Sequence, residues 1–245
     1  VLRVAPASGR PGRSIVDLPG YVYDYAISPD GKKAFFTYSE NDKPAEVFSI
    51  CAPWTPKPQR LTRVNQPLAA VRHVKGEVVR WKSEEGWDVE GLFWRPPRRV
   101  RPPYATVVIP HGGPHFVASN AHDPLSQALC AAGYAVFLPN FRGSTGYSEK
   151  FFRSIHSDWA LGPADDILRG VKSLVGKRLA DSKRIVLLGG SFGGYMTAWL
   201  IGHSKIFRAA VAHAPVVNNV SMWGTTDIPD FMEWSFKGTP FTSFK

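Results

Sequence analysis

The sequence contains little cysteine, with Cys51 and Cys130 the only two among its 245 residues. Two cysteines can build neither a disulfide framework nor a four-cysteine zinc site. A disulfide-rich domain and a four-cysteine zinc domain are therefore excluded. Cys130 lies in the apolar run 125–132, where a small buried hydrophobic side chain is expected. The scarcity of cysteine permits a reducing compartment, and a cytoplasmic location is our expectation.

Long hydrophobic runs are also missing. Apolar stretches such as 134–139 and 185–188 are much shorter than the roughly 18 residues that a membrane-spanning helix needs. The first residues, from Val1 to Pro6, contain neither an initiator methionine nor the apolar core of a signal peptide. We therefore expect no membrane partner, and we expect the chain to begin within a longer protein.

Acidic residues are outnumbered, because 20 Asp and Glu stand against 30 Lys and Arg, for a formal net charge of +10. Clustered basic residues are typical of nucleic-acid-binding proteins. The densest cluster, 95–103, interleaves four arginines with four prolines, and prolines exclude a helix or a central strand. No zinc-finger spacing, aromatic RNA-binding signature or basic heptad accompanies it, so we predict an extended, solvated connector and no nucleic-acid partner.

The remaining composition is that of a folded protein with two different patterns along the chain. Hydrophobic residues make up 44% and charged residues 20%, as in globular domains. Residues 1–70 alternate as short strands at 21–27, 33–38 and 45–51, with a turn at 28–31. A connector with a first hairpin, 78–83 and 87–94, is predicted within 71–103. The third region is 104–245.

Strands and helices alternate in this third region. Apolar strands are predicted at 105–110, 134–139, 184–188 and 209–214, and helices at 123–132, 163–175 and 192–201. Pro163 suits a first helical position, and Asp165 and Asp166 suit the positive end of the same helix. Nearly continuous apolar strands separated by helices indicate a parallel sheet covered by helices, so the fold class is α/β.

The sharpest motif is Gly-x-Ser-x-Gly, in which Ser191 follows a buried strand and precedes a helix. This arrangement is typical of a nucleophile on a tight strand-to-helix turn, with the backbone N–H of Phe192 directed at developing negative charge. An ordinary glycine-rich turn is the simpler alternative. A dinucleotide loop is disfavoured because Ser191 occupies the position of its second glycine, and the next acidic residue is Asp227.

A second motif, His111-Gly112-Gly113, follows an upstream strand. In α/β-hydrolases such a loop donates one N–H to the oxyanion hole. His111 and His115 are also spaced as a helical metal pair, but Gly112-Gly113-Pro114 between them breaks any helix. We predict neither a metal nor a cofactor.

Together the motifs resemble the prolyl oligopeptidase family of serine peptidases, most closely its acylaminoacyl-peptidase and dipeptidyl-peptidase branch. The matching segments are 81–91, 111–114, 140–147, 189–196, 214–217 and 223–227. The resemblance implies an α/β-hydrolase fold, incomplete at its C-terminus. It also implies that the antiparallel strands of residues 1–70 are the remnant of a β-propeller blade. Short peptides would be the substrates.

The resemblance also assigns roles to residues. Ser191 becomes the acylated nucleophile, and Phe192 and Gly113 supply the oxyanion N–H groups. Val216 and Val217 resemble the wall of the pocket for the residue before the scissile bond. The loops that support the site are His111 with Gly112, and Arg142 with Gly143. Some family members carry a tyrosine where His111 stands, which favours the N–H of Gly113 as the donor.

A general base and an orienting acid are not evident. In α/β-hydrolases the acid and then the histidine follow the serine. Here Asp227, Asp230 and Glu233 follow Ser191, but no histidine follows them, and His203 and His213 precede all three. We expect these two histidines to be structural. The resemblance places the acid and the base beyond Lys245, so we assign neither and expect the chain to be inactive as given.

Two other functions remain open at this stage. The first is a carboxylesterase or lipase on the same fold, and the second is a non-catalytic interaction protein with a degenerate hydrolase fold. Endopeptidase, dipeptidyl-peptidase and acylaminoacyl-peptidase specificities are not separated by the sequence. A homo-oligomer is possible.

Overall fold

The computed structural model describes residues 2–4, 13–16, 18–54 and 57–242. The chain divides into two compact units. The first unit combines Val1–Gly76 with Ser119–Gln127, and the second combines Glu77–Ala118 with Ala128–Lys245. The three-part division predicted from the sequence, with boundaries after residues 70 and 103, stays a prediction.

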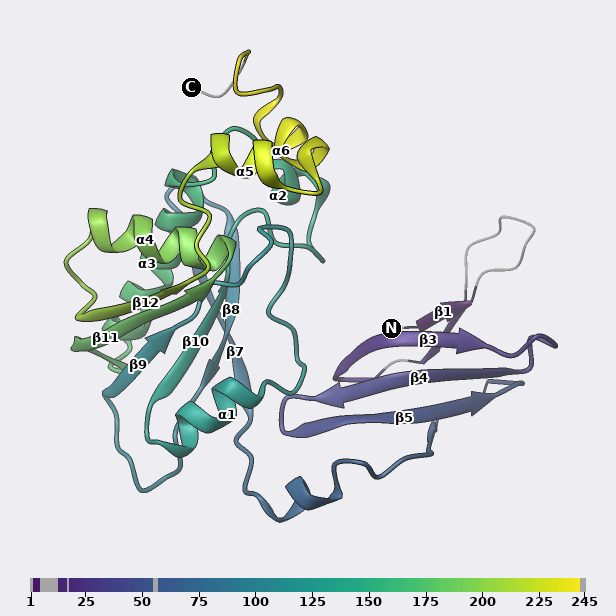
Figure 1. The fold of residues 1–245 in the computed structure, drawn as a ribbon. Helices are drawn as coiled ribbons and strands as arrows, with labels where there is room; N and C mark the ends of the chain where they lie inside the picture. Colours follow the sequence, from purple (N-terminus) through teal and green to yellow (C-terminus); the bar gives the residue numbers. More distant parts are fainter. Residues whose placement is uncertain (1, 5–12, 17, 55–56, 243–245) are drawn as a thin grey trace. The chain divides into compact units, whose positions relative to one another are not determined.

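The first unit is an antiparallel sheet with the order β3-β4-β5-β6 (Figure 1). Its strands are β3 (Tyr21–Ile27), β4 (Lys33–Glu40), β5 (Lys43–Cys51) and β6 (Gln59–Arg60), and the 3-10 helix η1 (Gln66–Ala70) follows. A separate pair joins β1 (Leu2–Val4) to β2 (Arg13–Val16). The three strands predicted in this region are confirmed.

Alternation along β4 explains the small core of this unit. Successive side chains of a strand point to opposite faces, and Ala34, Phe36 and Tyr38 are buried while Lys33 and Phe35 are exposed. Cross-strand partners complete a cluster of four buried residues: Ala34, Phe36, Tyr38 and Ile50. So few buried side chains make this sheet marginal in isolation.

The second unit contains a six-stranded sheet with the order β12-β11-β9-β10-β8-β7 (Figure 1). The strands are β7 (Gly76–Lys82), β8 (Asp88–Trp94), β9 (Tyr104–Val108), β10 (Ala135–Asn140), β11 (Ala180–Gly190) and β12 (Ala209–His213). The four strands β12, β11, β9 and β10 are parallel, and β8 pairs with β10 antiparallel. The predicted α/β class and the first hairpin are confirmed.

Six helices are described in the chain. They are α1 (Pro124–Ala131), α2 (Glu149–Arg153), α3 (Leu161–Gly176), α4 (Phe192–His203), α5 (Asn219–Thr225) and α6 (Pro229–Phe236). Helices α3 and α4 pack against each other and against β11. None of the helices in the described ranges is long and apolar enough to cross a membrane.

The start of α3 differs from the prediction. The helix begins at Leu161, so Pro163 occupies its third position and not its first. The carboxylate of Asp158 accepts hydrogen bonds from the free N–H groups of Leu161 at 2.7 Å and Gly162 at 2.8 Å, as acidic caps of helix starts do. Asp166, predicted to complement the helix end, is buried and bonded to Arg142 instead.

Candidate active site

Ser191 lies on a tight turn between β11 and α4. Its backbone has φ 55° and ψ −121°, a conformation that costs a residue with a side chain about 1–3 kcal/mol. The residue is exposed. In such a turn the serine hydroxyl stands clear of both the strand and the helix, which is the arrangement required of a nucleophile.

Glycines make the turn possible because three backbone segments approach each other there. A Cβ on Gly189 would lie 2.1 Å from the carbonyl oxygen of Gly193, and a Cβ on Gly193 would lie 2.1 Å from that of Pro110. Real Cβ atoms do not occupy such positions, so any larger residue forces the backbone apart. The Gly-x-Ser-x-Gly spacing is therefore a packing requirement at this turn.

The His-Gly-Gly loop lies directly beside the turn. A Cβ on Gly112 would be 3.6 Å from the Cβ of Ser191 and 3.5 Å from the carbonyl oxygen of Gly190. Gly113 has φ +117°, which a residue with a side chain rarely adopts. The structure thus brings together two motifs that are about eighty residues apart in the sequence.

Two backbone N–H groups are left for a ligand at this point. The N–H of Ser191 donates to the carbonyl oxygen of His213 at 3.0 Å. Within the described ranges, the N–H groups of Phe192 and Gly113 donate to no other backbone group. Phe192 is the first residue of α4, where the helix dipole adds positive potential.

A neighbouring loop, 141–145, holds the His-Gly-Gly loop in place. The Nε2 of His111 hydrogen-bonds with Ser144 Oγ at 2.9 Å, and its ring stacks on Phe141 with centroids 4.3 Å apart. The Nδ1 of His115 donates to the carbonyl oxygen of Gly143 at 2.8 Å. These contacts make both histidines structural parts of the loop.

Burial fixes the charge of His111. Desolvation lowers the pKa of this imidazole to about 4, against an ordinary value near 6.5. Burial also lowers the pKa of His115. Both rings are therefore neutral at pH 7, and each presents one N–H and one lone pair to its neighbours.

The loop 141–145 is itself anchored by a buried ion pair. Asp166 is fully buried and accepts hydrogen bonds from the backbone N of Arg142 at 2.8 Å, from its Nε at 3.0 Å and from its Nη2 at 2.9 Å. The Nη1 of Arg142 also donates to Glu85 at 2.9 Å. Burial alone lowers the pKa of Arg142, but the bonds to Asp166 and Glu85 outweigh it, so the pKa is raised.

The residues after β12 border the same turn. Ala214 has a positive φ of 42°, and a Cβ on Gly194 would meet the carbonyl oxygen of His213 at 2.8 Å and the Cα of Pro215 at 3.0 Å. Val216 is partly buried, while Val217 is 66% exposed. Their predicted role as a pocket wall stays a prediction.

The two histidines that were expected to be structural have different surroundings. His203 ends α4, where its Nδ1 donates to the carbonyl oxygen of Trp199 at 2.8 Å and its ring stacks on that indole. His213 is exposed, and its Nδ1 would lie 3.7 Å from a Cβ on Gly190. Its carbonyl oxygen, not its imidazole, contacts Ser191.

Sequence reasoning missed Asp166 and Ser144 as supports of the site. Asp166 was interpreted as a helix-end acid, and Ser144 as one residue of a motif. The sequence did contain a signal for Asp166. This charged residue lies among the residues of the apolar face of α3, next to Ile167 and Gly170. No local signal identifies Ser144, because its partners His111 and Phe141 come together only in the fold.

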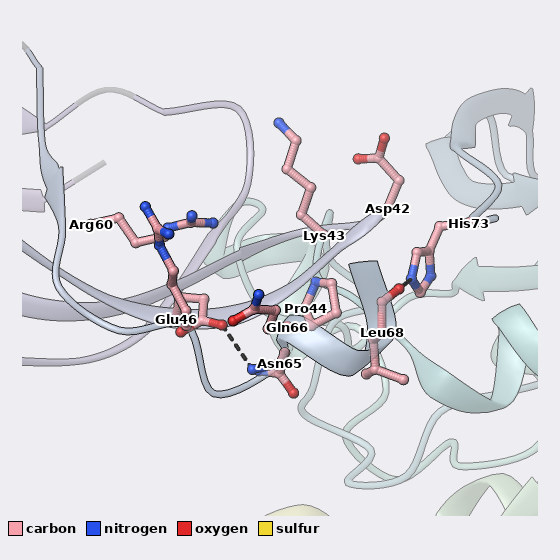
Figure 2. A pocket seen from close by; sticks show the side chains of 10 residues that line it. Asp42, Lys43, Pro44, Glu46, Arg60, Asn65, Gln66, Leu68 and His73 are labelled. Carbon is pink, nitrogen blue, oxygen red and sulfur yellow. Dashed lines mark hydrogen bonds between the residues drawn. The ribbon is translucent and has the colours of Figure 1, made fainter. Parts of the chain in front are cut away.

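The first unit contains a separate cavity of about 380 Å³ (Figure 2). Charged and polar side chains line much of it, among them Lys43, Glu46, Arg60 and His73. Glu46 is committed to the fold, because its carboxylate accepts hydrogen bonds from the backbone N of Asn65 at 2.9 Å and from Val64 at 3.1 Å. None of the lining residues was predicted as a site residue.

The fold and the strand-to-helix turn at Ser191 (the elbow) are those of an α/β-hydrolase. Comparisons with known proteins agree. Residues 122–243 match the profile of the prolyl oligopeptidase family, and the chain belongs to this family of serine hydrolases. A similar curated protein is an uncharacterized peptidase, YuxL, of Bacillus subtilis, 30% identical over 225 residues that cover 90% of this chain and 34% of that protein.

Other relatives lie in the same family. The acylamino-acid-releasing enzyme of Homo sapiens is 36% identical over 162 residues, which cover 64% of this chain and 22% of that enzyme. Among solved structures, an acylaminoacyl peptidase of Pyrococcus horikoshii superposes with a TM-score of 0.83 at 24% identity, covering 95% of this chain and 37% of that one. The chain therefore spans about a third or less of the length of these relatives.

We predict that Asp166→Asn destabilises the second unit by about 3–5 kcal/mol, because the guanidinium of Arg142 loses its buried counter-charge and keeps the largely exposed Glu85 as its partner. The neighbouring Asp165→Asn is the matched control. Asp165 is 28% exposed and pairs with Arg169, so its loss costs about 1 kcal/mol or less. Urea unfolding of both variants measures the difference, and equal losses would contradict the anchoring role of Asp166.

We predict that Gly193→Ala separates the elbow from the end of β9, because the added methyl group would overlap the carbonyl oxygen of Pro110. Thermal unfolding is expected at a markedly lower temperature. Gly202→Ala in the same helix has no atom within 4 Å of the new methyl group and should stabilise by about 0.4–1 kcal/mol. A stable Gly193→Ala variant with unchanged unfolding would show that the close approach is not a constraint.

We predict that His111 contributes to acid sensitivity. Its pKa is lowered to about 4 in the folded state, so its contribution is complete above pH 6.5 and is lost as the pH falls toward 4. This loss is at most about 3 kcal/mol. In His111→Gln the unfolding free energy should decrease less between pH 7 and pH 4.5 than in the parent. His203→Gln, at an exposed site, is the control, and identical pH profiles for all three proteins would refute the prediction.

Proposed function

We propose that Ser191 is the nucleophile of a serine peptidase that hydrolyses short peptides through an acyl-enzyme. The observation that carries this proposal is the contact between the elbow and the His-Gly-Gly loop. A Cβ added to Gly112 would lie 3.6 Å from the Cβ of Ser191, so the two loops are close enough that a carbonyl group attacked by the serine would sit between Phe192 and Gly113.

The geometry supports the first chemical step as follows. The Oγ of Ser191 attacks the substrate carbonyl carbon, and the carbonyl oxygen becomes negatively charged. The N–H groups of Phe192 and Gly113, which have no backbone acceptor in the described chain, would donate to that oxygen. Collapse of the tetrahedral intermediate expels the amine, which takes up the proton that the hydroxyl of Ser191 has lost, and leaves an ester on Ser191. Water then hydrolyses the ester to the free acid and restores the serine hydroxyl.

The buried ion pair supports this step indirectly. Arg142 and Asp166 fix the loop 141–145, and Ser144 and Gly143 of that loop bind His111 and His115. The His-Gly-Gly loop is therefore rigid on both sides of Gly113. A preorganised donor stabilises developing charge more than one that must reorient during the reaction.

The substrate class is proposed from the family and from the apolar segment after β12. Val216 and Val217 would form the wall for the side chain that precedes the scissile bond, and Val217 is 66% exposed and free to contact a ligand. The relatives named acylamino-acid-releasing enzymes support N-acylated short peptides as the first substrates to test. A cytoplasmic location fits this class of substrate.

The proton of Ser191 needs a base, and we propose that this chain supplies none. No histidine follows Asp227, Asp230 and Glu233 in the sequence, and the imidazoles of His111 and His115 are hydrogen-bonded to Ser144 and Gly143 of the loop 141–145. Loss of a triad member lowers turnover by about a thousandfold or more, while binding and the oxyanion hole persist.

We predict that a fluorophosphonate modifies Ser191 slowly and that added imidazole accelerates the reaction by replacing the absent base. Intact-mass and peptide mass spectrometry measure the rate and the modified residue. Ser191→Ala should abolish the modification, and Ser204→Ala, at the end of α4, should leave it unchanged.

Two outcomes would contradict the proposal in different ways. Modification that persists in Ser191→Ala would show that another residue is the nucleophile. Rapid hydrolysis of an acyl-peptide p-nitroanilide without imidazole, abolished by Ser191→Ala, would keep the nucleophile and overturn the absence of a base.

A further inference from the structure

The positive charge of the chain is concentrated in three short segments. Residues 95–103, 177–184 and 205–208 together hold ten Lys and Arg but a single acidic residue, Asp181. The net charge of the whole chain is +10. Nearly the entire excess therefore lies in three short segments that are far apart in the sequence.

The topology places these segments at one end of the six-stranded sheet. Residues 95–103 precede β9, residues 205–208 precede β12, and residues 177–184 include the first five residues of β11. These three strands are adjacent and parallel. Arg95 follows β8, whose last residue, Trp94, pairs with Val136 near the start of β10. The amino-terminal ends of the parallel strands and the end of β8 consequently share one edge, which Figure 1 shows along the starts of these strands.

Hydrogen bonds join the segments directly. The N–H of Tyr104 donates to the carbonyl oxygen of Leu179 at 2.7 Å, and the N–H of Arg208 donates to that of Ile185 at 2.8 Å. The Nη2 of Arg184 donates to the carbonyl oxygen of Pro103 at 3.0 Å. We call the resulting row the basic edge. It consists of Arg95, Arg98, Arg99, Arg101, Lys177, Arg178, Lys183, Arg184, Lys205 and Arg208.

Within the described ranges, eight of the ten basic side chains of the basic edge form no ion pair. All ten side chains are exposed. Among the described residues, two of them form ion pairs, Arg95 with Glu77 and Arg184 with Asp181. Neighbouring strands are about 4.8 Å apart, so the remaining like charges repel one another until an anionic partner neutralises them.

The site around Ser191 occupies the other end of the same strands. Ser191 follows β11, the His-Gly-Gly loop follows β9, and Arg142 follows β10. A partner on the basic edge would leave the substrate site open. The basic edge is thus a separate surface and not part of the proposed peptidase chemistry.

We propose that the basic edge binds an acidic polypeptide segment. From β12 to β8 the edge crosses four inter-strand spacings, about 19 Å in length. An extended polypeptide covers that length with about six residues at roughly 3.3 Å each. A segment rich in Asp and Glu would place a carboxylate within reach of each strand end.

The side chains between the charges favour a polypeptide over nucleic acid or lipid. Tyr134 is the one large apolar side chain exposed in the described connectors before β9, β10, β11 and β12. Single-stranded nucleic acids are held by several aromatic platforms in succession, and membrane surfaces by an inserted apolar face. The basic edge offers neither.

The test is binding of a fluorescein-labelled decaglutamate peptide to the full chain, followed by fluorescence anisotropy. The triple variant Arg98→Glu, Lys177→Glu and Lys205→Glu reverses three charges for which no ion pair is described. The triple variant Lys32→Glu, Lys33→Glu and Lys57→Glu, in exposed positions of the first unit, makes the same change in net charge. If the charge-reversal variant of the basic edge fails to fold, a milder variant, Arg98→Gln, Lys177→Gln and Lys205→Gln, which removes the same three charges without reversing them, takes its place.

We expect the edge variant to bind the peptide at least about tenfold more weakly than the parent. The control triple should retain parental affinity, and the milder set should lose part of it. Binding should weaken as salt is raised. Equal losses in the edge and control variants, or no binding by the parent at low salt, would overturn the proposal. So would tighter binding of an oligonucleotide or of anionic vesicles under the same conditions.

Discussion

The site depends on one backbone contact, the approach of α4 to the end of β9. A Cβ on Gly193 would lie 2.1 Å from the carbonyl oxygen of Pro110, so the first turn of α4 rests directly on the strand that leads into the His-Gly-Gly loop. This contact sets the separation between Ser191 and Gly112. Parallel strands β9 and β11 are neighbours in the sheet, and their carboxyl ends therefore meet at this point, as ligand sites of α/β sheets do.

Polar interactions keep that separation fixed from the other side. The ion pair of Arg142 and Asp166 is buried in the core of the second unit, where an isolated charge would be very costly. The loop it anchors binds His111 through Ser144. The chemistry proposed for Ser191 therefore relies on two features. Glycines permit the close approach of α4 to the His-Gly-Gly loop, and a buried ion pair holds the loop 141–145, which in turn holds the His-Gly-Gly loop in place.

The sequence predicts the sheet and the elbow well because both signals are local. The spacing of apolar residues along the chain identifies the strands β3 to β5 and β8 to β12. The glycines around Ser191 reflect the close approach of Gly189 to Gly193, which are only four residues apart. Helices α5 and α6 were missed because they are short and α5 has no fully buried side chain, while α6 fully buries Met232 and Ser235 and packs others, such as Phe231, only in part. The role of Asp166 was missed because its partner Arg142 is distant in the sequence. The basic edge was missed because its three segments come together only in the folded sheet.

The most direct test of the account is the crystal structure of the chain with a peptide boronic acid bound to Ser191. The account predicts a bond from boron to the Oγ of Ser191. It also predicts one boronate oxygen about 2.7–3.1 Å from both the N of Phe192 and the N of Gly113, as in an oxyanion hole. A boronate that bonds elsewhere, or one whose oxygen points away from these two N–H groups, would contradict the account.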